Sequence, residues 1–297
     1  MAAFEPFGNR IGTAIFAAVL PIPNLIDAFE FVNVSAGVLA AGAMTLWLRI
    51  FVSTPAIRII LSVLFCLAWS HPIRFAALAP MLADPMGQLI NISSFCCVML
   101  YAKTREIRYL VAVAVLSSIG VAFREFALIP AFALLFVGNP INRRLLRKIT
   151  RPLQFARESS QILFAKNRIK LIIPLICAVL ALKGVDALTD GYGTETYLGS
   201  LVLHLVLVDF FRYLAAWFHV FGPALALIII FGRSLLLFIY RNQVFTAPAL
   251  AIGFLTWFGG LDHERYLIME APFVLGLVES FWSVNAKFLL VEPFSCS

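Results

Sequence analysis

Long apolar runs, separated by short charged or turn-rich breaks, fill most of this 297-residue chain. The runs are continuous rather than alternating, which favours membrane helices over the strands of a barrel. A hydrocarbon core of roughly 30 Å requires spans of about 20 residues. The pattern predicts an all-α polytopic membrane protein, one domain over 1–297, with short outer-face helices. About nine crossings are expected, at 31–51, 56–72, 86–102, 109–122, 125–138, 171–187, 220–239, 242–259 and 267–288.

Composition excludes a water-soluble globular domain. Hydrophobic residues make up 62% of the chain and charged residues only 13%. A soluble domain is about half apolar and about a quarter charged, because it needs a polar surface. The lipid bilayer is therefore the expected partner and solvent of this chain.

The positive charge is concentrated in one segment. The net charge is +7, and residues 139–170 carry nine Lys and Arg residues against one acid, Glu158. This excess predicts a cytoplasmic loop under the positive-inside rule. Contact with an anionic lipid is compatible with that prediction. No nucleic-acid-binding motif accompanies the charge, so nucleic acid is not expected as a partner.

Basic residues in short loops also predict the orientation. Arg49, Arg58, the segment 103–108, the loop 139–170 and Arg241 mark the cytoplasmic side. Segments 1–30, 73–85, 188–219 and 260–266 are then expected outside. The stretch 109–138 lies between two basic segments, which predicts two short helices that meet near residues 123–125. Residues 198–218 carry charges among aromatics and are expected to form an interfacial helix on the outer leaflet.

Four polar places on the predicted outer face are candidates for chemistry, because ionisable groups at membrane depth are costly. Asp84-Pro85 fits a helix start, or a carboxylate that faces a cavity. Arg124-Glu125 either locks a turn by pairing or offers a guanidinium to a phosphate. The third place is the loop 258–266, which is dense in charge. The fourth is the N-terminal segment 4–12.

The residue pattern does not predict a metal site or a nucleotide-binding site. The four histidines lack metal-ligand spacing, so no metal site is expected. Four of the five cysteines lie inside apolar runs, which favours packing. There is no phosphate-binding loop, dinucleotide fingerprint or Ser-His-Asp pattern.

The order of these four places resembles the GT-C superfamily, the integral membrane glycosyltransferases that use polyprenyl-phosphate-linked sugars. Its "PF-x-x-R" to "LP-x-P" stretch is matched from Pro6 to Arg10 and from Leu20 to Pro23. Its Asp-Pro before a helix is matched by Asp84-Pro85, and "(R/K)-E-x-A-L" by Arg124 to Leu128. Its "GG-x-D-x-x-R" loop is matched from Gly259 to Arg265, with Pro272 in the following helix. The resemblance covers nearly the whole chain.

The resemblance implies transfer of a sugar from a polyprenyl-phosphate donor on the outer face of a bacterial inner membrane, with no certain cofactor. An acid deprotonates the acceptor, and cations hold the phosphate as it leaves. The expected catalytic residues are Asp84, Glu125 and Asp262. The expected substrate-binding residues are Arg124, Arg265, Glu264, Tyr266 and Arg10. The donor sugar and the acceptor are not encoded in any recognisable motif.

One departure and two alternatives remain open. Such enzymes usually begin with a membrane helix and an acidic outer loop, and this chain starts after that place. Either the natural start lies upstream of Met1, or the protein is a shortened relative that need not be active. A secondary transporter would instead bring Lys183, Asp186, Arg233 and Glu279 to the membrane midplane. A non-catalytic subunit of a membrane assembly is the third possibility.

Overall fold

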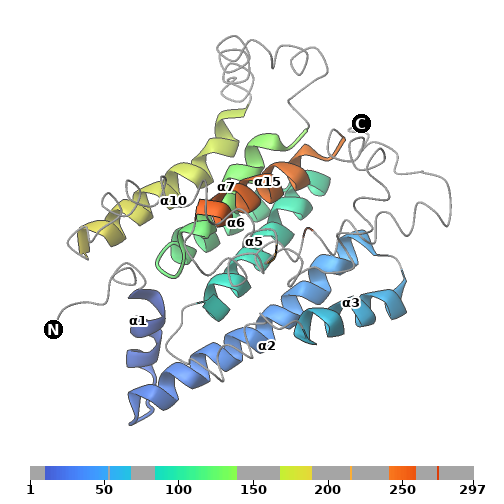
Figure 1. Ribbon diagram of the computed structural model, residues 1–297. Coiled ribbons are helices and arrows are strands. Elements are labelled where there is room, and N and C mark those ends of the chain that lie inside the picture. Colours follow the sequence, from blue (N-terminus) through green and yellow to red (C-terminus); the bar gives the residue numbers. More distant parts are fainter. Residues whose placement is uncertain are drawn as a thin grey trace.

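The computed structural model describes residues 11–52, 54–67, 84–138, 168–188, 215, 241–258 and 273 (Figure 1). Every secondary-structure element in these ranges is a helix, which confirms the all-α expectation. The helices are α1 (Ile11–Val19), α2 (Leu25–Phe51), α3 (Pro55–Leu67), α5 (Asp84–Thr104), α6 (Ile107–Gly120), η1 (Glu125–Ala127), α7 (Leu128–Ala133), η2 (Leu134–Phe136), α10 (Ile169–Leu188) and α15 (Gln243–Phe258).

Three of these helices are long and apolar enough to cross a bilayer, namely Leu25–Phe51, Pro85–Thr104 and Ile169–Leu188. This is fewer than the nine crossings expected. Four further apolar helices coincide with expected crossings but are shorter, such as α6 with 14 residues. A helix of that length rises only about 21 Å. The expected crossings at 220–239 and 267–288 lie outside the described residues, apart from Phe273.

The longest helices, α2 and α5, pack side by side and run in the same direction. Two contacts set their register. The Cys96 thiol lies 3.8 Å from the Ala43 carbonyl oxygen, and Lys103 Nζ donates to the Ile50 carbonyl oxygen at 3.2 Å. Both contacts join residues 53 positions apart and lie two turns from each other on each helix. The two helices therefore keep one register over these two turns.

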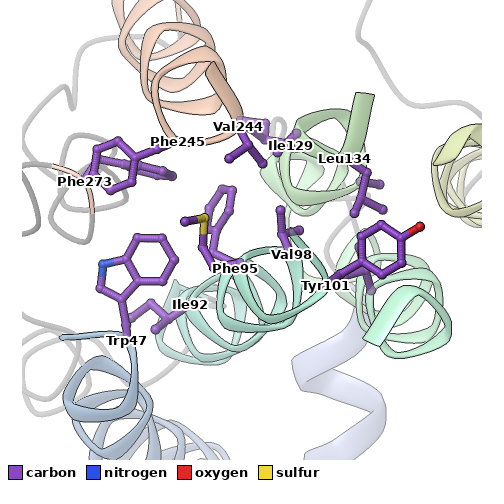
Figure 2. Packing of buried hydrophobic residues seen from close by; sticks show 14 of the residues in the cluster. Trp47, Ile92, Phe95, Val98, Tyr101, Ile129, Leu134, Val244, Phe245 and Phe273 are labelled. Atoms are coloured by element: carbon purple, nitrogen blue, oxygen red, sulfur yellow. The ribbon is translucent and has the colours of Figure 1, made fainter. Parts of the chain in front are cut away.

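An aromatic cluster fills the core where α2, α5 and α15 converge (Figure 2). Trp47 is fully buried, and its ring centroid lies 6.0 Å from that of Phe245 and 6.2 Å from that of Phe95. Phe273 contacts all three rings at 4.7–5.7 Å. Aromatic pairs at these separations add to the stabilisation that comes from area burial alone. This cluster ties α15 to the α2–α5 pair.

The helix termini gather at two opposite ends (Figure 1). At one end α2 and α5 finish and α3, α6, α10 and α15 begin; we call this the basic end. At the other end α2 and α5 begin and α6 finishes at the turn that carries Arg124; we call this the Arg124 end. The stretch 107–136 leaves the basic end as α6 and returns as η1, α7 and η2, as the sequence predicted. The chain therefore alternates between the two ends.

Rows of apolar side chains remain exposed along several helices. One row on α6 contains Val111, Val115 and Ile119, and one on α10 contains Ile169, Ile173, Ile176 and Leu180. The residues of each row lie three or four positions apart, so each row follows one helix face. Contiguous apolar surface of this extent is unusual on a soluble monomer. These rows are suited to contact with lipid chains.

Candidate functional site

A tight turn joins α6 to η1 and positions Arg124. The Arg124 amide donates to the Gly120 carbonyl oxygen at 2.9 Å, and the Arg124 carbonyl accepts from the Ala127 amide at 3.0 Å. A methyl group at Gly120 would lie 2.6 Å from Cβ of Ala127. Contacts below 3.0 Å do not occur between real side chains without movement. Gly120 thus allows the end of α6 to approach η1 closely enough to form this turn.

Arg124 is one of the largest fully buried side chains that the structure describes, with 1% of its surface exposed. Its aliphatic stem packs on the first turn of α5, where a methyl group at Gly87 would lie 2.8 Å from Cγ of Arg124. That turn begins at Asp84 and contains Pro85. The backbone of the Asp84-Pro85 motif therefore lies one turn from the Arg124 contact. Two of the predicted site segments meet here.

Glu125 does not pair with Arg124. Its side chain is exposed while Arg124 is buried, and no ion pair joins the two among the described residues. Arg124 is in an extended conformation and Glu125 begins η1, so the adjacent side chains are placed in different environments. The interpretation that this turn is locked by an Arg124–Glu125 ion pair is wrong.

Helix α1 covers the same turn. The Gly12 amide donates to the Ala122 carbonyl oxygen at 2.9 Å, and the rings of Phe16 and Phe123 lie 5.7 Å apart. A methyl group at Gly12 would lie 2.8 Å from the Phe123 ring. The chain segment after the expected "PF-x-x-R" motif is thus packed against the Arg124 turn. A third predicted segment joins the first two at this end.

Buried polar side chains extend from the Arg124 end into the bundle. Gln88, Asn91 and Ser94 follow one face of α5 at intervals of three residues, and all are at most 3% exposed. Asn33 on α2 and Ser117 on α6 are fully buried as well. The hydroxyls of Ser94, Ser117 and Thr13 form no hydrogen bond in the part of the chain that the structure describes. Sequence reasoning missed this polar interior, although the three-residue spacing within an apolar run was a readable signal.

The basic end is built differently. Arg168 Nη2 donates to the carbonyl oxygens of Leu135 and Val137 at 2.6 and 2.7 Å. Burial lowers the pKa of the Arg168 guanidinium from its ordinary value, and the nearby charge of Arg105 lowers this pKa further. Arg105 itself ends α5 with a positive φ of 59°, a conformation that usually requires glycine. Two guanidinium groups from different segments are thereby held near each other.

Several predicted site residues lie outside the described part of the chain. They are Arg10, Asp262, Glu264, Arg265, Tyr266 and the side chain of Asp84. Within the described ranges, no group of three His, Cys, Asp or Glu residues could hold a metal ion.

Comparison with known proteins adds no relative. No protein-family model, curated protein or solved structure matches this chain. Functional interpretation therefore depends on the residues and their geometry.

Proposed function

We propose that this chain is a membrane glycosyltransferase-like protein of the GT-C type. It would take a sugar from a polyprenyl-phosphate donor at the Arg124 end, which faces outward from a bacterial inner membrane. About nine crossings, with the loop 139–170 on the cytoplasmic side, complete the proposed topology. A single domain over 1–297 and an unidentified acceptor are part of the same proposal.

The observation that carries the proposal is the fully buried Arg124 beside a polar interior. Burying a cation away from water costs several kcal/mol, so a buried arginine marks a place where its charge has a role. In a desolvated site its attraction for a phosphate is much stronger than in water. The buried hydroxyls of Ser94 and Ser117 lie on helices that begin or end at the same level. Hydroxyl-rich sugars match such groups by hydrogen bonding.

The proposed chemistry is the transfer of a glycosyl group at its anomeric carbon. The acceptor oxygen forms a bond to that carbon while the bond to the phosphate oxygen breaks. A carboxylate, Asp84, Glu125 or Asp262, accepts the acceptor proton. Arg124 and Arg265 hold the departing polyprenyl phosphate, whose negative charge grows as the bond breaks. Glu264, Tyr266 and Arg10 complete the proposed substrate-binding set.

Arg124→Lys tests the proposal, because lysine keeps the charge but loses the planar fork that contacts two phosphate oxygens. We expect polyprenyl-phosphate binding to the full chain to weaken roughly ten- to a hundred-fold, as for loss of a charged hydrogen bond. Arg49→Lys is the matched control, since Arg49 is exposed at the basic end. The melting temperature of each variant in detergent micelles, measured under the conditions of the binding assay, reports any effect on the fold.

Two results would count against this function. Equal affinity of the Arg124→Lys variant and the unmodified chain removes the phosphate clamp. A lower melting temperature with unchanged lipid affinity assigns Arg124 to structure alone.

A secondary transporter is the second candidate, and the polar face of α5 favours it. Gln88, Asn91 and Ser94 occupy the first half of this helix and reach about its midpoint. A transporter predicts intramembrane charges at the midplane, yet Lys183 and Asp186 pair with each other on α10 at 3.6 Å. Substrate flux across sealed vesicles, without sugar transfer, would favour this alternative.

A further inference from the structure

Positive charge dominates the basic end. Ten Lys and Arg residues lie in the described ranges, and eight of them are at this end: Arg49, Arg58, Lys103, Arg105, Arg108, Arg168, Lys170 and Arg241. Glu106 is the only acid described there, and it forms an ion pair with Arg108 Nε at 2.5 Å. The described part of this surface therefore carries a large net positive charge.

Two of these cations converge on one short segment. Arg168 is oriented by its two hydrogen bonds to the Leu135 and Val137 carbonyls. Arg105 reaches the next residue, since a methyl group at Gly138 would lie 3.7 Å from Arg105 Nη2. Gly138 has a φ of 83°, so a glycine provides the sharp exit of the chain here. The two guanidinium groups repel each other, and an anion between them is attracted to both and offsets this repulsion.

The backbone of Arg105 is strained in order to hold this position. Its amide donates to the Tyr101 carbonyl oxygen at 2.9 Å, which ends α5 in the left-handed conformation. For a residue with a side chain this conformation is unfavourable, because Cβ approaches the carbonyl oxygen that follows. Glycine is the usual residue at such a helix end. An arginine thus stands where glycine would adopt the backbone conformation without strain, which points to a use for its charge.

Exposed apolar side chains continue from the cations along the helix sides. Arg105 precedes α6 and Arg168 precedes α10, and these two helices pack together. Ile107 and Val111 on α6 and Ile169 and Ile173 on α10 are all at least half exposed. Each of these two helices thus has an arginine just before its first turn and an exposed apolar row that follows it. A free phosphate ion would use only the cations, whereas an amphiphile uses both.

We propose that Arg105 and Arg168 bind the phosphate of an anionic phospholipid. The acyl chains of that lipid lie along Ile107, Val111, Ile169 and Ile173. Arg168 is pre-oriented by the two carbonyls, so little side-chain entropy is lost when the lipid binds. This site is at the opposite end from Arg124 and is independent of the proposed sugar transfer.

Arg105→Gly separates lipid binding from folding. Glycine adopts the left-handed conformation without strain, so the fold in neutral phosphatidylcholine should be at least as stable. The full chain is purified with equal amounts of phosphatidylglycerol and phosphatidylcholine, and the retained lipids are counted by native mass spectrometry. We expect the preference for phosphatidylglycerol to fall by at least about ten-fold, as for loss of a charged hydrogen bond. Arg105→Asn, which also tolerates this conformation, should show the same loss.

Arg49→Gln is the matched control, because it removes the same charge from an exposed position at the same end. Diffuse attraction of lipids to a basic surface is worth about 1 kcal/mol per charge, roughly five-fold at most. Equal losses in Arg105→Gly and Arg49→Gln would overturn the assigned site. Displacement of phosphatidylglycerol by millimolar inorganic phosphate would overturn the assignment to a lipid.

Discussion

The two ends of the helix bundle handle positive charge in opposite ways. At the Arg124 end, one arginine is buried against Gly87, in a turn that α1 covers, and buried polar side chains continue along α5. At the basic end, most cations are exposed, and the interior beneath them is the aromatic cluster around Trp47. Polar groups thus enter the interior near one end, while the other end carries its charge on the surface.

This difference separates two causes of charge placement. Exposed cations at one membrane face are expected from topology, because cytoplasmic loops are enriched in Lys and Arg. A buried cation has no such general cause, since it loses hydration and needs specific compensation. We therefore expect a catalytic or substrate-binding site beside Arg124, whereas the basic end is suited to binding a partner at the membrane surface. If this distinction holds, the two ends should differ measurably in location, in packing and in electrostatics.

The largest expected effect concerns location, because accessibility across a membrane is all or none. In a chain without native cysteines, Glu125→Cys at the Arg124 end should react with an impermeant maleimide in intact cells. Thr54→Cys, exposed between α2 and α3 at the basic end, should react only after the membrane is permeabilised. Labelling of Thr54→Cys in intact cells, with Glu125→Cys protected, would reverse the proposed orientation and contradict an outward-facing site.

A smaller effect concerns packing at the Arg124 end. Gly120→Ala places a methyl group 2.6 Å from Cβ of Ala127 and 2.8 Å from Cγ2 of Ile90. We expect a loss of about 1–3 kcal/mol in the free energy of unfolding, typical of an overpacked core. The measurement is reversible unfolding in mixed micelles, followed by circular dichroism.

Gly184→Ala is the control for that substitution, because nothing lies within 4 Å of the added methyl group. Alanine is the better helix former, so this change should be neutral or stabilising by up to about 1 kcal/mol. Similar losses at both glycines would mean that α6 and η1 do not approach each other as closely as described.

Helix positions could be predicted from hydrophobicity, but the details of the site could not. The run at 86–102 predicted α5 within two residues at each end, because a helix that crosses a bilayer must be predominantly apolar. The sequence left two interpretations of Arg124-Glu125 open, an ion pair or a phosphate-binding guanidinium, because adjacent positions in sequence do not specify side-chain direction at a turn. The contact of Arg124 with Gly87 depends on how α6, η1 and α5 pack, which no local pattern encodes. The α5 polar row was detectable by its spacing and was overlooked.

The smallest expected effect concerns the Lys183–Asp186 pair near the end of α10. These residues lie three positions apart on one helix, with Lys183 Nζ 3.6 Å from Asp186 Oδ2 and the Lys183 side chain largely exposed. Exposed pairs on a helix contribute about 0.3–0.5 kcal/mol, because water screens them and both side chains lose freedom. A long lysine side chain within about two turns of a helix end can also extend to the membrane surface. A double-mutant cycle of Lys183→Met and Asp186→Asn, measured by unfolding in micelles, should therefore give a coupling below about 0.5 kcal/mol. A coupling well above that value would place the pair away from water, as a transporter requires, and would extend the polar interior to α10.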